Sequence, residues 1–167
     1  RDVYKRQALD RMPISRDATV AEIVKYAASD LLLARADEPE GLVAAEQAAW
    51  DPILDWAAKE LGAKFTPAAG FFLPDQDQAA LNAVAARAST FDDFRLTALA
   101  HLGALYGSSL LALAVLSGRL SPSEGFDASR VDEAWQEAKW GVDYEAAERT
   151  ARLKGEVEAV ERYLKAL

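Results

Sequence analysis

The sequence is organised around an uncharged stretch, residues 96–118, which reads LTALAHLGALYGSSLLALAVLSG. As one continuous helix this stretch would be roughly 35 Å long, which is enough to cross a bilayer. A helix that is apolar nearly all round either spans a membrane or forms the centre of a helical bundle. His101 and Ser108 dilute the apolar section and no run of basic residues flanks it, so we favour the bundle. We therefore predict an all-α fold of about six or seven helices around a central helix from Leu96 to Gly118.

Length and composition favour one acidic domain without metal chemistry. The chain has 167 residues, with 19 Lys and Arg against 27 Asp and Glu, and its formal net charge is -8. This charge argues against nucleic acid or an anionic membrane as the partner. Because the chain has no cysteine and one histidine, a disulfide framework and a His-rich zinc site are excluded. We expect no cofactor, no metal and no insertion into a membrane.

Capping residues and apolar periodicity predict further helices on both sides of the uncharged stretch. The clearest local signal is Ser121-Pro-Ser-Glu124, a capping box with proline at the first helical position. Thr19-Val-Ala-Glu22 is a second capping box, and an apolar stripe that continues past Pro52 indicates a kinked helix. The predicted helices cover residues 19–35, 37–62, 75–88, 122–140 and 143–167, with one short extended segment near residues 64–73.

Residues 1–17 carry mixed charge and show no clear period, so we interpret them as a linker. The chain does not begin with methionine, and we expect it to be a fragment whose own N-terminus is missing. Residues 18–167 would then form one α-helical domain.

The predicted helix over residues 122–140 has two contrasting faces at 100° per residue. One face carries Val131, Ala134, Trp135 and Ala138, and the opposite face carries Glu133, Gln136, Glu137 and Trp140. If Trp135 is buried, a second indole and two carboxylates point outward, which is unusual for a surface that binds nothing. In the alternative, Trp140 folds back under the turn at Gly141 and packs on the last helix.

Clustered carboxylates leave a helical-bundle enzyme as an alternative. The candidate acids are Asp92, Asp93, Asp132 and Glu133. Adjacent acids point about 100° apart on a helix, and a carboxylate-bridged di-metal site needs two histidines. His101 and Ser108 would lie about 10 Å apart along a helix, too far for proton transfer. We therefore assign no catalytic residue and no metal ligand, and we expect no enzymatic activity.

Four motifs follow one another along the chain: YAASDLL at 26–32, WDPILDWA at 50–57, GSSLLALA at 107–114 and SRVDEAWQEAKWGVD at 129–143. Their order and spacing resemble the C-terminal part of the ATP12 family of F1-ATPase assembly chaperones, over about residues 8–167. In that family a β-rich N-terminal domain precedes an α-helical one. The resemblance therefore implies that residues 1–17 are the remnant of the first domain.

The resemblance also implies a chaperone that is not an enzyme. Members of the family bind the unassembled α subunit of F1 and shield its subunit interface until the β subunit replaces the chaperone. We accordingly expect a monomer that acts in the cytoplasm of a bacterium or, in a eukaryote, in the mitochondrial matrix. A helical adaptor module is a further alternative.

We predict one partner-binding surface on the late helix. Its residues are Asp132, Glu133, Gln136, Glu137, Trp140 and Gly141. The family's sensitivity to acidic residues in this helix corresponds to Glu133, with Asp132 beside it. Acidic groups would orient the partner by charge complementarity, and the exposed indole would supply affinity.

Overall fold

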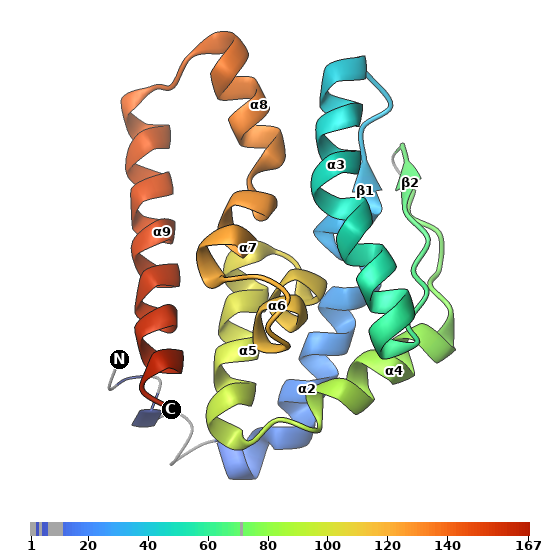
Figure 1. Ribbon diagram of the computed structural model, residues 1–167, viewed down its shortest axis with the longest axis vertical. Helices are drawn as coiled ribbons and strands as arrows, with labels where there is room; N and C mark the ends of the chain where they lie inside the picture. Colours follow the sequence, from blue (N-terminus) through green and yellow to red (C-terminus); the bar gives the residue numbers. More distant parts are fainter. Residues whose placement is uncertain (1–2, 4, 7–11, 71) are drawn as a thin grey trace.

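The protein is a bundle of helices, and the all-α prediction is confirmed (Figure 1). The computed structural model describes residues 3, 5–6, 12–70 and 72–167. From residue 12 onward the described chain contains eight α-helices, namely α2 (Met12–Ala28), α3 (Glu40–Trp56), α4 (Gln78–Ala88), α5 (Asp93–Tyr106), α6 (Ser109–Leu116), α7 (Pro122–Ser129), α8 (Val131–Trp140) and α9 (Tyr144–Lys165). Strands β1 (Ala34–Arg35) and β2 (Ala68–Ala69) pair in parallel, and β2 lies where we expected extended structure.

The uncharged stretch is not one helix, so the prediction of a continuous helix from Leu96 to Gly118 was wrong. Helix α5 ends at Tyr106, and Gly107 has a φ of 69°, a left-handed conformation that glycine adopts without steric cost. Ser108 then begins α6, because its hydroxyl oxygen accepts a hydrogen bond of 3.0 Å from the backbone N–H of Leu111. The break lets α6 turn back against α5 instead of extending away from it.

A buried carboxylate from another part of the chain holds this break in place. Asp30 is fully buried, and its Oδ1 accepts the hydroxyl hydrogen of Ser108 at 2.5 Å. Its Oδ2 accepts the backbone N–H of Leu110 at 3.0 Å, so the carboxylate lies at the N-terminus of α6, where a helix favours negative charge. Asp30 also accepts the backbone N–H of Leu32 at 3.2 Å and so begins the short 3-10 helix Leu31–Leu33.

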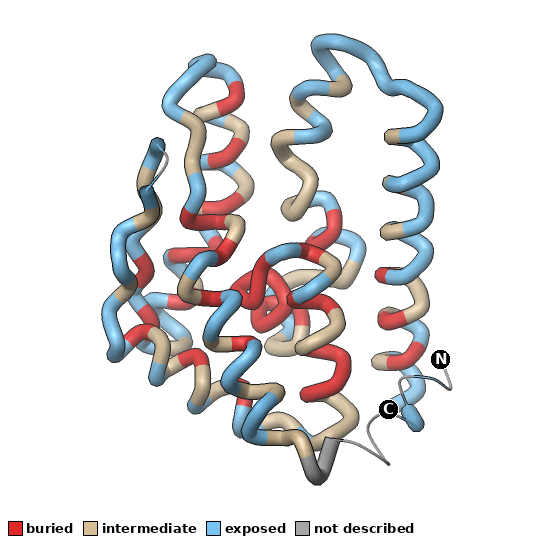
Figure 2. Tube along the Cα trace, turned by 180° about the vertical axis from the view of Figure 1, so that it is seen from behind, coloured by how far each residue is buried: buried red, intermediate tan, exposed pale blue. Residues whose placement is uncertain are grey.

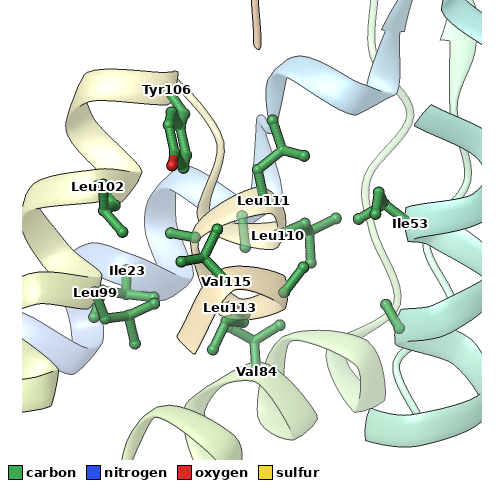
Figure 3. Packing of buried hydrophobic residues seen from close by; sticks show 14 of the residues in the cluster. Ile23, Ile53, Val84, Leu99, Leu102, Tyr106, Leu110, Leu111, Leu113 and Val115 are labelled. Atoms are coloured by element: carbon green, nitrogen blue, oxygen red, sulfur yellow. The ribbon is translucent and has the colours of Figure 1, made fainter. Parts of the chain in front are cut away.

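Helix α6 forms the centre of the core. Every residue from 109 to 115 is buried, and the helix packs against α2, α3, α5 and α7. Figure 3 shows side chains from α2, α3, α4 and α5 gathered around Leu110, Leu113 and Val115 of α6. A short helix that is apolar on every side is stable here because other helices cover every face.

Two other predicted helices have different bounds. The predicted helix over residues 19–35 was wrong at both ends, because α2 begins at Met12 and the chain leaves it after Ala28 for the inward turn at Asp30. Residues 12–17, which we interpreted as linker, are helical, and Arg16 Nη1 lies 2.7 Å from Asp93 Oδ1. The division of the chain at residue 17 stays a prediction.

The predicted helix over residues 122–140 is two helices, α7 and α8, which meet at Arg130. Helix α8 packs on α3, and the second half of α9 packs on α5 and α7 through Val157, Val160 and Tyr163. The hairpin of α8 and the first half of α9 therefore extends beyond the core, and its far end is exposed (Figures 1 and 2). Among the described residues, no helix has both the length and the apolar character that a membrane span needs.

Candidate functional site

A groove of about 580 Å³ lies between α8 and the first half of α9. All six residues of the predicted partner-binding surface line it, namely Asp132, Glu133, Gln136, Glu137, Trp140 and Gly141. Helix α9 supplies the opposite wall through Ala146, Arg149, Thr150 and Leu153. The sequence pattern thus located one wall of this groove, and the tertiary structure adds the other.

Helix α8 is held to the body by its inner face. The indole of Trp135 lies against Gly41 of α3 so closely that a Cβ at this glycine would be 3.3 Å from Trp135 Nε1. Lys139 covers the same indole, with its Nζ 4.9 Å from the ring centre. Since this face is fixed on α3, the opposite face of α8 presents Glu133, Gln136 and Trp140 outward. The side chain of Trp140 is 77% exposed, so the alternative in which it packs on the last helix was wrong.

Asp132, a predicted site residue, is partly buried against the body. It lies close to Glu46 of α3, and its Oδ1 is buried with no hydrogen-bond partner in the described part of the chain. Burial first, and then the neighbouring carboxyl of Glu46, together raise the pKa of Asp132 to about 6. Two carboxyl groups this close are most stable when one of them keeps its proton.

Glu46 is a residue that the sequence analysis missed. It is 2% exposed, and its Oε1 accepts the backbone N–H of Ala36 at 2.8 Å. A signal was present, because Leu42, Glu46 and Trp50 follow one another at four-residue spacing on the buried face of α3. An acid in the middle of an apolar stripe is a sign of a specific partner.

The charges around the groove are mainly acidic. Four carboxylates line it, from Asp132, Glu133, Glu137 and Asp143, against the two guanidinium groups of Arg130 and Arg149. Arg130 already interacts with Glu137 across 3.5 Å, and Asp143 caps α9 by accepting the backbone N–H of Ala146 at 2.7 Å. The groove consequently attracts a partner that carries basic groups.

The far end of the hairpin carries three large apolar side chains in water. Trp140 and Tyr144 are each 77% exposed, and Val142 between them is 54% exposed. Trp140 and Val142 also line the groove, whereas Tyr144 does not. Exposed apolar side chains that adjoin a groove and are surrounded by charge are typical of protein-binding surfaces.

The other candidate acids do not join this site. Asp92 caps α5 through the backbone N–H of Arg95 at 2.8 Å, and Asp93 pairs with Arg16, at the end of the molecule away from α8 (Figure 1). Among the described residues, no group of three or more His, Cys, Asp or Glu side chains is placed to hold a metal ion. Burial lowers the pKa of His101, which favours its neutral form.

Comparison with known proteins gives a family match at the start of the chain and structural matches over most of it. The ATP12 chaperone protein family matches residues 4–58, so the similarity begins slightly before residue 8, where we placed its start. Atp12 from Paracoccus denitrificans and an aspartate-to-lysine mutant of the same protein are each 38% identical, with a TM-score of 0.89, over 94% of this chain and 67% of theirs. A chaperone candidate from Agrobacterium tumefaciens is 36% identical, with a TM-score of 0.90, over 97% of this chain and 61% of its own.

Proposed function

Because the chain belongs to the ATP12 family of chaperones, we propose that it assists assembly of the F1 sector of ATP synthase by binding the unassembled α subunit. The client binds to the acidic groove between α8 and α9. The chaperone shields the subunit interface of α, which would otherwise aggregate, and leaves when the β subunit takes that place. It does so as a monomer, in the bacterial cytoplasm or in the mitochondrial matrix of a eukaryote.

The observation that supports this proposal is that the five predicted residues of α8, and Gly141 directly after it, all line one groove. A chaperone of this kind needs to bind its client and does not need to catalyse a reaction. The groove offers two kinds of binding interaction. Its carboxylates accelerate encounter with a basic surface and orient it. The exposed indole of Trp140 is the type of large, rigid side chain that carries much of the affinity at protein interfaces.

Release follows from the same balance. If most of the affinity comes from one aromatic anchor, as at many interfaces, a larger competing interface can exceed it. The β subunit, which forms a permanent interface with α, then displaces the chaperone by mass action without any need for nucleotide hydrolysis.

Capture of isolated F1 α subunit tests the proposal. The chain immobilised on resin should retain α and not β, and retention should fall as salt rises from about 0.05 M to 0.3 M because screening weakens charge attraction. Glu133→Lys should reduce retention at least about tenfold, which corresponds to 1.4 kcal/mol. Glu148→Lys is the matched control, because Glu148 is exposed on α9 and does not line the groove.

Three results would contradict the proposal in different ways. If the folded chain does not retain α, the α subunit is not its client. If it retains α and β equally, binding is not specific for α. Equal loss with Glu133→Lys and Glu148→Lys would show that net charge matters and that the groove does not.

A further inference from the structure

Resting on the proposed function, we infer that the groove receives its client as an amphipathic helix with basic side chains, which lies between α8 and the first half of α9 as a third helix. The first sign is that half of α9 lacks a partner. None of residues 144–156 is buried, whereas Val157 and Val160 farther along the same helix are 1% exposed. Helix α9 therefore extends about three turns past the elements that cover it.

The uncovered half of α9 nevertheless has a consistent face. Ala146, Thr150 and Leu153 are its only partly buried residues, and their spacing of four and three places them on one side, toward the groove. This stripe is roughly 10 Å long, or two turns. On the other wall, Glu133, Gln136 and Trp140 also extend over two turns of α8. The side chains on both walls extend over two turns and follow each other at helical spacing. A helix that lies between the walls can therefore pack its own ridges of side chains against them.

The backbone of the groove favours a helix over an extended segment. Both walls are helices, whose N–H and C=O groups are bonded within each helix. An extended client segment would find no edge with which to pair, and its own backbone groups would lose water without compensation. A helix satisfies its backbone internally, so it can enter such a groove with only its side chains to accommodate.

Size and charge define the occupant further. A volume of about 580 Å³ takes a row of side chains rather than a whole helix, so the client helix lies along the groove and inserts one face. The small side chains of Ala146 and Thr150 leave room for aliphatic groups there. Lys or Arg on the flank of the client helix would face Glu133, and the indole of Trp140 would cover its end.

Overlapping peptides that span the F1 α subunit provide the test. Each peptide carries a fluorescent label and is titrated with the whole chain, with anisotropy as the measurement. We expect the peptides that bind to be basic on one face, to gain helical circular dichroism on binding, and to be displaced by intact α. Proline at the centre of such a peptide should weaken binding at least about tenfold, because it breaks the helix, whereas alanine at the same position should change binding less than about threefold.

Matched variants of the chain locate the binding. Leu153→Asp on the groove wall should abolish peptide binding, while Ala151→Asp, on an exposed position of α9 outside the groove, should leave it unchanged. Circular dichroism of the two variants checks that both fold.

The outcomes separate this inference from the proposed function. The helical occupant would be contradicted if intact α is captured but no peptide binds, if the bound peptides tolerate proline, or if the two aspartate variants have equal effects. In each of these cases the F1 α subunit would still be the client. If helical peptides bind but intact α is not captured, the F1 α subunit is not the client, while the inference that the groove binds a helix is retained.

Discussion

Two aspartates with similar titration lie in regions of opposite character. Burial raises the pKa of Asp30 in the core to about 6, and burial together with the Glu46 carboxyl raises the pKa of Asp132 at the groove to about 6. Asp30 receives three hydrogen bonds, from the backbone of Leu32 and Leu110 and from the hydroxyl of Ser108. Asp132 has a buried oxygen with no donor in the described chain and a second carboxyl, that of Glu46, beside it.

This difference distinguishes the core, which stabilises the fold, from the hairpin of α8 and α9, which is available to a partner. Both carboxylate oxygens of Asp30 accept hydrogen bonds, so the carboxylate specifies one arrangement of α2, α5 and α6. In the hairpin, α8 has no residue classed as buried, and one oxygen, Asp132 Oδ1, is enclosed without a hydrogen-bond partner in the described chain. Proteins usually tolerate such locally unfavourable arrangements at sites that bind something. The predictions below test this division by their effect on stability.

The largest loss of stability is expected from Asp30→Ala. The substitution leaves two backbone N–H groups and one hydroxyl buried without an acceptor, and it should lower the free energy of unfolding by about 3–5 kcal/mol. Urea denaturation followed by circular dichroism measures the change. Asp37→Ala, on an exposed position, is the control and should change stability by less than about 0.5 kcal/mol. A loss below about 1 kcal/mol for Asp30→Ala would mean that the junction does not depend on this carboxylate.

Two glycine-to-alanine substitutions, one in the core and one in the hairpin, should change the free energy of unfolding in opposite directions. A Cβ on Gly125 of α7 would lie 2.7 Å from the hydroxyl oxygen of Tyr106, which donates to the carbonyl of Pro122. Gly125→Ala should therefore cost about 1–3 kcal/mol of stability.

Gly155→Ala on α9 is the matched change. Its Cβ would meet nothing within 4 Å, so the helix should gain about 0.5–1 kcal/mol from the better propensity of alanine. Thermal unfolding of both variants checks the pair. Destabilisation by both would mean that the first half of α9 has a close partner in solution.

The pH dependence of stability should change in Asp132→Asn. A carboxyl whose pKa is raised to about 6 in the folded state stabilises that state below the unfolded value of 3.8, and this stability is lost as pH rises through about 6. The variant lacks this loss. Relative to the wild type it should therefore gain stability between pH 4 and pH 7, by about 1 kcal/mol after allowance for the solvent around Asp132. Urea unfolding at the two pH values measures the gain, and a pH-independent difference would rule out titration of Asp132 as its source.

The smallest effect on stability is expected from Trp140→Ala. The indole is 77% exposed, so the free energy of unfolding should change by less than about 0.5 kcal/mol. Binding of F1 α subunit should nevertheless weaken at least about tenfold, as for an aromatic anchor. Tyr144→Ala is equally exposed but outside the groove and should change neither quantity. If Trp140→Ala lowers stability, the indole packs against the body of the protein and is not a free part of the binding surface.

Much of the local structure could be predicted from the sequence. Ser121 and Glu124 form both hydrogen bonds of the capping box, at 2.8 and 3.0 Å, and Asp143 caps α9. The outward face of α8 also follows from helical periodicity, because Trp135 and Trp140 occupy different sides at 100° per residue. These features involve residues within about one or two turns of each other, so the amino-acid order alone specifies them.

The break in the uncharged stretch has a local signal in Gly107 and Ser108, which end α5 and cap α6, but helical periodicity does not reveal it. Residues 96–118 have no polar face whose phase would reveal a change of direction, and Gly103 is as small as Gly107 but stays inside α5. The group that selects the break is Asp30, which is 78 residues away from Ser108 in the sequence. Periodicity contains no information about a contact at that separation.

The sequence by itself determined the all-α class, the helix caps at Ser121 and Asp143, and the acidic, aromatic face of α8. Only the tertiary structure decided that α6 turns back into the core, that Asp132 lies beside Glu46, and that the first half of α9 faces α8 across a groove. The reason is physical. Caps and helical faces depend on hydrogen bonds and side-chain directions within a few residues, whereas burial and pairing depend on which distant segments exclude water from one another.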